Sequence, residues 1–486
     1  MITPDAPDHH YSTRLRTAIV LTGSGTAGAY HAGVLRALQE AGVKIDLVAA
    51  RGAGVISAIF TAVDGGARLW EPNGLWRTSP AAAFYRWRLP LRIAGWSVAA
   101  AGIIFAVPLA LLALAVLVGV AGLLLTLVGL DSAGTTLRTT FRGWLDALFA
   151  PDALPTSIPR LVLFSLLVGV ATLAVGALVS AIRTRSRRRT RPTLMWRLLG
   201  APLSTRAMFD RTLAELWNLI RGAAAVAAPS PRDLGRRYIE LLSDNLGQPG
   251  FRELLVTAHD MDARRDVVFA LLAPAHRLRF FGRAGAPDSA GRYLEAFDLS
   301  GASREHAFDA LAAALALPVA TEPHLVTFSA EGPWRGETHR ICDRPGALGR
   351  LLEEVAAAGA EQVIVVSASS PAARAHELSS GRADLRGRAG EHLAAFEAAG
   401  LRDVLEHFGG RFAGLFVIRP THNPLGPLDF RGVYDERSDR MHSLSELVDR
   451  GYEDAYRQFI EPVVGAGGER MQVQPANGRA AGPSSL

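Results

Sequence analysis

Two glycine-rich turns near the start of the chain hold residue types that could do chemistry. The first, Gly23-Ser24-Gly25-Thr26-Ala27-Gly28, lies between an apolar stretch and a predicted helix. Glycines let a backbone approach a ligand closely, and N–H groups at a helix start favour negative charge. Such a loop is typical of a phosphate cradle in a dinucleotide-binding fold or of an oxyanion hole for acyl transfer. A tight strand–helix turn without any ligand has the same composition.

The second turn, Ala50-Arg51-Gly52-Ala53-Gly54, follows the next predicted strand. A nucleophile elbow places a serine at a strained strand–helix turn whose neighbours must be small. The neighbours here are small, but glycine stands at position 52, where an attacking hydroxyl is needed. We therefore expect the geometry of an elbow without its nucleophile.

Together the two turns resemble the opening of the patatin-like phospholipase family. In that family the second turn is Gly-x-Ser-x-Gly, and its serine is the nucleophile. The residues that match the family's first loop and helix are Gly28, Ala29, Tyr30, Gly33, Val34 and Leu35. The chain departs from the family at Ser24 and Ala27, where glycine and arginine are usual.

The resemblance implies a patatin-like three-layer α/β sandwich with a mainly parallel central sheet. It implies an oxyanion hole at Gly23, Ser24, Gly25 and Gly28. It also implies an elbow backbone formed by Ala50, Gly52 and Gly54.

The family pairs its serine with an aspartate that is followed by a helix and an apolar strand. Asp343 fits this order, because the predicted helix 347–358 and the strand 363–368 follow it. Glycines that the family carries beside this aspartate are replaced by Arg344 and Pro345. The resemblance assigns Asp343 as the remnant acid, whereas a turn or helix cap is the structural alternative. Asp298 and Asp429 are further candidates without the helix–strand pair.

Two long uncharged runs, 93–130 and 161–182, interrupt this pattern. Each exceeds the ~20 apolar residues that a membrane helix needs. Arginines flank both outer ends, and positive charge prefers the cytoplasmic side. We therefore predict two transmembrane helices near 96–125 and 161–182, with the first run forming either one kinked helix or a hairpin. An amphipathic segment, 141–148, is predicted to lie at the far interface.

The predicted organisation is a disordered N-terminus, a split domain and a disordered tail. The ranges are 1–14 for the N-terminus, 15–75 and 195–464 for the two parts of the domain, 76–192 for the membrane insert, and 465–486 for the tail. Because residues 1–14 lack an apolar segment, we expect no signal peptide. If both parts build one sheet they share one compartment, which we expect to be the cytoplasm.

Other elements are predicted from apolar periodicity. The predicted helices cover 197–222, 304–317, 347–358 and 444–460, and the predicted strands cover 254–257, 267–271, 363–368 and 412–419.

Composition narrows the range of partners. The net charge is +6 among 486 residues, and Cys342 is the single cysteine, so an intrachain disulfide is excluded and a metal site is not expected.

Arg187, Arg188 and Arg189 belong to an arginine-rich run that is either a topology signal or an anionic-lipid headgroup site. Aromatic residues are not interleaved there, so nucleic-acid binding is not expected.

The sequence supports three hypotheses about function. The first is a membrane-anchored, degenerate lipid acyl hydrolase that binds phospholipid or acyl groups and needs no cofactor. The second is an active hydrolase with a displaced nucleophile, Ser24 or Ser57. The third is a nucleotide-binding membrane protein that uses the Gly23–Gly28 loop, with Asp46 or Arg51 on the ribose side.

Overall fold

The computed structural model describes residues 11–78, 85–148, 157–184, 200–282, 294–332, 334–367, 385–421, 433–435 and 440–465. The chain divides into two compact units. The first comprises Met1–Arg86 and Ser204–Leu486, and the second comprises Trp87–Leu203. The second unit thus begins and ends about ten residues later than the predicted insert 76–192. Its start is later because the short helices α3 (Ala67–Trp70) and α4 (Leu75–Thr78) bury side chains in the first unit.

A mixed sheet forms the centre of the first unit, with nine strands among the described residues. Its main order is β11-β10-β1-β2-β5-β6-β7, and β9 pairs with β5 and with β8. The strands are β1 (Thr17–Leu21), β2 (Leu47–Ala50), β5 (Glu253–Asp260), β6 (Arg265–Leu271), β7 (Ala296–Asp298), β8 (His324–Thr327), β9 (Thr338–Cys342), β10 (Gln362–Val366) and β11 (Gly414–Ile418). Most neighbours are parallel, while β6 and β9 run antiparallel to β5.

The two parts of the sequence that flank the insert close into this one sheet. β2 lies before the insert and β5 after it, and they pair in parallel with Ala50 opposite Val256. β1 sits between β2 and β10, with Leu21 opposite Ala50 on one side and Val366 on the other. The turns that follow β1 and β2 therefore meet at the carboxyl-terminal ends of these two central strands.

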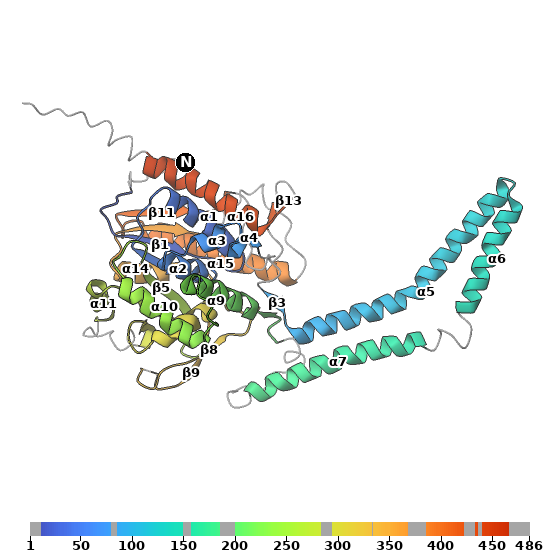
Figure 1. Cartoon of the computed structure of the whole chain (residues 1–486), viewed down its shortest axis with the longest axis horizontal. Helices are drawn as coiled ribbons and strands as arrows, with labels where there is room; N and C mark the ends of the chain where they lie inside the picture. The colour runs from blue at the N-terminus through green and yellow to red at the C-terminus, as the bar shows by residue number, and fades with distance from the viewer. Residues whose placement is uncertain are drawn as a thin grey trace, which may run out of the picture. The chain divides into compact units, whose positions relative to one another are not determined.

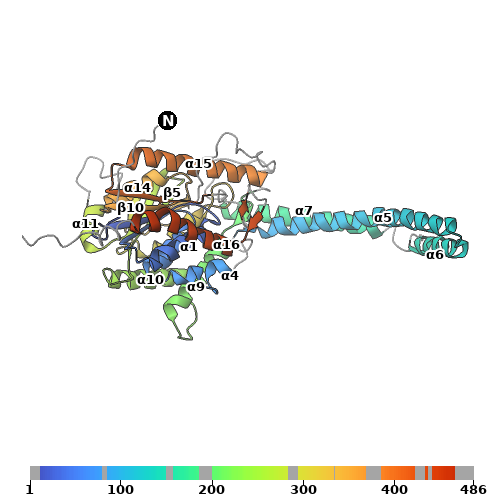
Figure 2. The ribbon, with the colours of Figure 1, turned by 90° about the horizontal axis from the view of Figure 1, so that it is seen from above.

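Helices cover both faces of the sheet (Figure 2). One face carries α14 (Leu348–Ala357) and α15 (Leu385–Phe408), and the other carries α1 (Ala27–Glu40), α16 (Leu444–Ala455), α9 (Arg206–Arg221) and α10 (Pro231–Asn245). Beneath α14 and α15, apolar side chains of Leu351, Val365 and Val404 form part of one buried core. The first unit is therefore a layered α/β structure with a mostly parallel central sheet.

Several element boundaries differ from those predicted. The hairpin β5–β6 is longer than predicted, because its polar end is held by bonds such as that between His259 and Asp266. The predicted helix 304–317 is a 3₁₀ turn, Arg304–His306, followed by α13 (Ala307–Leu315). The predicted helix 444–460 ends as α16 at Ala455, and a π-helix, Tyr456–Gly465, continues it.

The remaining elements of the first unit are short. They are α2 (Gly54–Ala62), α11 (Pro274–Phe281) and the pair of strands β12 (Val433–Asp435) and β13 (Arg440–His442). Within the predicted N-terminal segment 1–14, the described residues begin at Tyr11, whose hydroxyl accepts a 2.7 Å hydrogen bond from the Lys44 N–H.

The second unit consists of three helices, α5 (Leu89–Leu127), α6 (Asp131–Leu148) and α7 (Ser157–Thr184), among its described residues (Figure 1). The first apolar run is one helix with Pro108 inside it, which decides between the two forms left open by the sequence. At 39 residues α5 is about 58 Å long, well beyond a hydrocarbon core of ~30 Å. The short strands β3 (Arg86–Trp87) and β4 (Leu203–Ser204) pair where the chain enters and leaves this unit.

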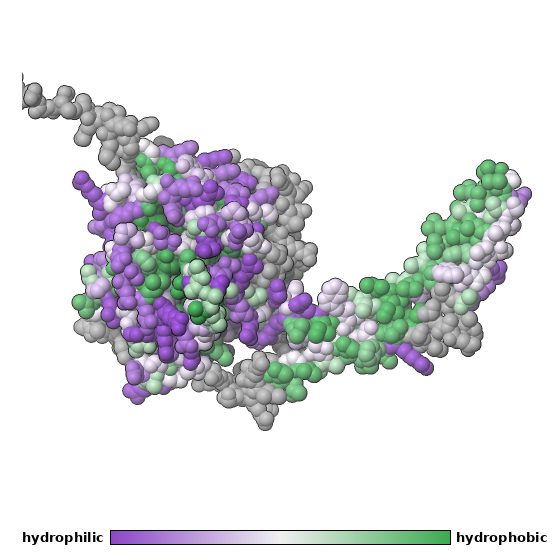
Figure 3. Space-filling model, viewed as in Figure 1, coloured by the Kyte–Doolittle hydropathy of each residue, from purple (hydrophilic) through white to green (hydrophobic). Residues whose placement is uncertain are grey.

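α5 and α7 pack through small residues, as membrane helices often do. A Cβ added to Gly169 of α7 would lie 3.2 Å from the Cβ of Ser97 on α5, so the two helices are in direct contact. Away from the contact between α5 and α7, the apolar side chains of both helices are exposed. Figure 3 shows hydrophobic residues gathered over both helices. By length and composition, Leu89–Leu127 and Ile158–Val179 could each cross a membrane.

α1 and α16 touch backbone to backbone because each presents a glycine to the other. A Cβ added to Gly33 would lie 1.8 Å from the Val448 carbonyl oxygen, and one added to Gly451 would lie 2.2 Å from the Tyr30 carbonyl oxygen. This contact holds the helix that begins at the first glycine turn.

Replacing Gly33 with alanine should therefore force the two helices apart. We expect a loss of about 1–3 kcal/mol in the free energy of unfolding, measured by urea denaturation in detergent. Gly349→Ala is the matched control, because the nearest atom to its added Cβ is 3.7 Å away. An equal effect of the two substitutions would contradict the close packing of α1 on α16.

Candidate functional site

The first glycine turn connects β1 to α1. Gly23 has a φ of 128° and Gly25 a φ of 61°, and L side chains rarely adopt either conformation. Gly28 has a different role, because a Cβ added there would lie 2.1 Å from the Trp76 ring. Gly28 thus makes room for Trp76 against α1, and its part in an oxyanion hole stays a prediction.

The second turn connects β2 to α2 and has the compactness predicted for an elbow. Gly52 has a φ of +58°, and a Cβ added to Gly54 would lie 2.4 Å from the Leu21 carbonyl oxygen. Ala50, the last residue of β2, is fully buried between its neighbouring strands. The Ala53 N–H donates a 2.9 Å hydrogen bond to the Gly23 carbonyl oxygen, so the two glycine turns are in direct contact.

Asp343 lies at this junction, where the turn after β9 brings it against both glycine turns. A Cβ added to Gly52 would lie 3.2 Å from Asp343 Oδ2. The Ser24 hydroxyl donates a 3.1 Å hydrogen bond to the same oxygen. The structure thus brings together Asp343, Gly52 and the first glycine turn, which the sequence predicted to share one site.

The space at position 52 is filled by backbone. A Cβ there would lie 2.2 Å from the Gly23 carbonyl oxygen, closer than real Cβ contacts occur. In a nucleophile elbow, the N–H of the residue after the nucleophile is an oxyanion donor. Here that N–H belongs to Ala53 and is used by the Gly23 carbonyl.

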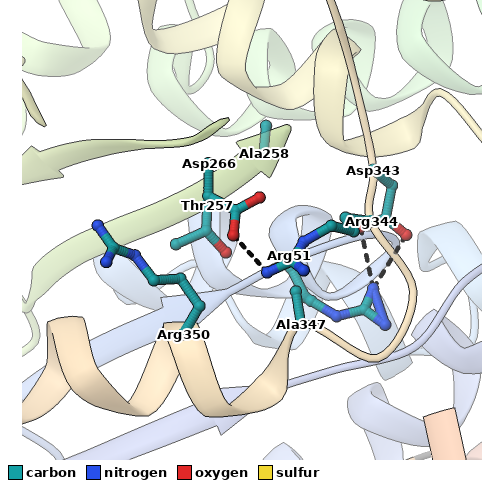
Figure 4. A pocket seen from close by; sticks show the side chains of 8 residues that line it. All are labelled: Arg51, Thr257, Ala258, Asp266, Asp343, Arg344, Ala347 and Arg350. Carbon is teal, nitrogen blue, oxygen red and sulfur yellow. Dashed lines mark hydrogen bonds and ion pairs between the residues drawn. The ribbon is translucent and has the colours of Figure 1, made fainter. Parts of the chain in front are cut away.

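Sequence reasoning named Arg51 only as a candidate nucleotide contact and missed its pairing with Asp343 and Glu397. The Arg51 side chain is 1% exposed, and its Nη1 lies 2.9 Å from both carboxylate oxygens of Asp343 (Figure 4). Its Nη2 forms an ion pair with Glu397 of α15. A signal for this role was present, because Arg51 is the single charged residue in an otherwise apolar and glycine-rich stretch, Leu47–Ala62.

Two buried aromatic groups surround the first glycine turn. Burial raises the pKa of Tyr85 well above its usual range, the negative charge of Asp343 adds to this shift, and a hydrogen bond with the Gly25 backbone opposes it. The Tyr85 hydroxyl therefore stays protonated close to the predicted oxyanion hole. Burial likewise lowers the pKa of His31 to about 4, although its hydrogen bond with the Thr22 carbonyl opposes the shift.

The His31 pKa predicts how stability depends on pH. In the unfolded chain histidine titrates near 6.5, so between pH 6.5 and 4 the unfolded state binds a proton that the folded state does not. Stability should fall as the pH falls through this window, by about 3 kcal/mol from this group. The substitution His31→Gln should flatten the pH dependence of urea unfolding over that range, and an unchanged slope would contradict it.

A small pocket lies beside the ion pair. Its wall includes Arg51, Asp343, Arg344 and Arg350, together with Asp266, Thr257 and two alanines (Figure 4). Arg344 is partly exposed and forms an ion pair with Asp266. The charged part of its wall therefore combines three guanidinium groups with two carboxylates.

The other candidate residues lie elsewhere or outside the described residues. Ser57 is fully buried in α2, and within the described part of the chain its hydroxyl has no hydrogen-bond partner. Asp298 is on the edge strand β7 and binds Arg277 and Ser300. Asp429 and the three arginines Arg187, Arg188 and Arg189 lie outside the described residues.

The nucleotide hypothesis gains no support from the site. Asp46 accepts a 2.9 Å hydrogen bond from the Thr17 N–H at the start of the strands, away from the turn. Arg51 is buried between two carboxylates and is not free to bind a 2′-phosphate.

Comparisons with known proteins add little. No family model matches the sequence, and no curated protein matches it. Among solved structures, VipD from Legionella pneumophila is 12% identical to this chain, and the match covers 92% of this chain and 67% of VipD with a TM-score of 0.28. At that TM-score the likeness carries no argument about function.

Proposed function

We propose that this chain is a membrane-anchored protein whose α/β unit has the shape of a patatin-like hydrolase and binds phospholipid or acyl groups without efficient hydrolysis. One observation carries the proposal. A Cβ added to residue 52, the position of the family's nucleophilic serine, would lie 3.2 Å from the Asp343 carboxylate, yet the residue is glycine. We interpret this pair as the remnant of a serine–aspartate dyad from which the serine side chain is absent.

Three features support impaired catalysis. Removal of a catalytic serine typically lowers turnover on the order of 10⁶-fold. The Ala53 N–H, the expected oxyanion donor, is bonded to the Gly23 carbonyl. Arg51 already occupies both carboxylate oxygens of Asp343 in a buried ion pair.

Binding can be separated from hydrolysis with a dialkyl-ether phosphatidylcholine, which has no ester to cleave. We expect the purified full chain in detergent to bind a fluorescent form of this lipid. Arg344→Glu at the pocket should weaken binding by roughly tenfold, as expected when a favourable charge contact becomes repulsive. Arg340→Glu is the matched control, because Arg340 is also partly exposed and paired with an aspartate, Asp262. Absence of binding, or equal loss in the two variants, would contradict the proposal.

We further propose that α5 and α7 cross the membrane and that the α/β unit is cytoplasmic. The pairing of β2 with β5 supports an even number of crossings, because both ends of the insert join one sheet. The arginines at both outer flanks favour the cytoplasmic side for that sheet.

Cysteine labelling tests this topology in intact cells. Thr140→Cys on α6 should react with an impermeant maleimide, whereas Ala224→Cys should react only after lysis. The native Cys342 should not interfere, because it is buried, and burial and the nearby Asp343 raise its pKa to about 12. Labelling of Ala224→Cys in intact cells would overturn the proposed orientation.

A second candidate is an active hydrolase in which Ser24 is the nucleophile. The 3.1 Å hydrogen bond from the Ser24 hydroxyl to Asp343 favours it, because a nucleophile and its base need such contact. Against it, Ser24 is buried and Arg51 already holds both Asp343 oxygens. A fluorophosphonate probe that labels the wild-type chain and spares Ser24→Ala would favour this candidate over the first.

A further inference from the structure

The two carboxylates that neutralise Arg51 are held very differently. Asp343 also accepts a hydrogen bond from Ser24, and its own N–H donates a 2.9 Å hydrogen bond to the Ala316 carbonyl oxygen. Glu397, in contrast, has its ion pair with Arg51 and no second hydrogen bond or ion pair among the described residues. Asp343 is therefore a fixed partner of Arg51, whereas Glu397 can leave by a side-chain rotation.

Glu397 belongs to α15, and this helix packs directly on the turn that follows Asp343. A Cβ added to Gly400 would lie 2.5 Å from the Gly346 carbonyl oxygen, so the two backbones are in contact. Beyond this point α15 is anchored, because Leu401 and Val404 are buried in the core. On the other side of Glu397, Phe396 is 51% exposed.

Charge balance indicates what could replace Glu397. Arg51 is 1% exposed, so loss of one carboxylate must be compensated by another anion. A guanidinium pairs well with a carboxylate in the plane of its N–H groups. An incoming carboxylate would replace Glu397 charge for charge and would reach Arg51 from the adjoining pocket, whose wall includes Arg51 and the partly exposed Arg344.

We infer that Glu397 occupies a binding site for a ligand carboxylate, which binds by displacing Glu397 from Arg51. This inference rests on the proposed function for the nature of the ligand, a fatty acid. A short carboxylic acid in solution carries the same carboxylate group as a fatty acid but lacks the long alkyl chain.

The test is calorimetric titration of the full chain in nanodiscs with octanoate and with propanoate. Glu397→Gln keeps the shape of the side chain and removes its charge, so we expect the octanoate dissociation constant to fall about tenfold. Glu406→Gln, at an exposed position of the same helix, should leave it unchanged. Adding Arg51→Lys to Glu397→Gln should reverse the gain, because lysine lacks the planar donor pair.

A gain for octanoate alone would identify an alkyl carboxylate as the ligand, and a gain for both acids would identify the carboxylate group itself. Equal binding by Glu397→Gln and Glu406→Gln would overturn the inference, and this comparison does not depend on the folding of the Arg51 variant. The ether phosphatidylcholine used above has no carboxylate. If this lipid binds but Glu397→Gln leaves the octanoate dissociation constant unchanged, only this inference is contradicted. If the lipid does not bind, the proposed function is contradicted.

Discussion

Replacing Arg51 with methionine is expected to destabilise the α/β unit by about 3–5 kcal/mol. Arg51 and Asp343 are both 1% exposed, and Glu397 is 12% exposed, so the substitution leaves two carboxylates in a largely buried site without a cation. Methionine retains much of the length of the arginine side chain, so the effect reports mainly on charge. Urea unfolding of the full chain in detergent, followed by tryptophan fluorescence, measures it.

The matched control is Arg206→Met on α9. Arg206 also forms an ion pair, with Asp210, but its side chain is 85% exposed. Such surface pairs contribute about 0–1 kcal/mol, so the control should unfold almost like the wild-type chain. If Arg51→Met and Arg206→Met lowered the free energy of unfolding by similar amounts, the ion pairs of Arg51 with Asp343 and Glu397 would not be what stabilises this site.

Introducing a serine at position 52 should destabilise the fold and should not create an active site. Its φ of +58° costs a residue with a side chain about 1–2 kcal/mol. The Cβ would also lie 2.2 Å from the Gly23 carbonyl oxygen, and overpacking of this kind costs about 1–3 kcal/mol. We therefore expect Gly52→Ser to lower the free energy of unfolding by about 3 kcal/mol and to show no gain in ester hydrolysis.

Gly42→Ser separates the two contributions. Gly42 has a similar φ of +66°, but a Cβ added there meets nothing within 4 Å. It should therefore show the conformational cost alone, about 1–2 kcal/mol. A Gly52→Ser variant as stable as Gly42→Ser and newly active on esters would contradict the close contact between the two glycine turns.

Much of the sheet could be predicted because its strands are short apolar runs next to glycine turns. β1, β2, β10 and α14 lie close to where the sequence placed them, and the order of Asp343, helix and strand was expected from the resemblance to a known family. Boundaries were less predictable where polar side chains continue a strand. β5 extends to Asp260 because His259 and Asp260 find partners on neighbouring strands.

The site was only partly predictable because its decisive contacts are distant in sequence or made by backbone. The partners of Arg51 lie 292 and 346 residues away, and no local pattern links them. The Gly23 carbonyl fills the position of a side chain at residue 52, which composition cannot reveal. Gly28 illustrates a further limit, since a glycine in a ligand-binding pattern here makes room for Trp76.

The most direct test of the central claim is the release of fatty acid from phosphatidylcholine vesicles by the purified full chain, quantified by mass spectrometry. Since no side-chain oxygen stands at position 52, we expect release equal to that from Ser24→Ala and to that from vesicles without protein. Release well above this background that disappears in both Ser24→Ala and Asp343→Asn would instead establish an active dyad and contradict a binding protein without efficient hydrolysis.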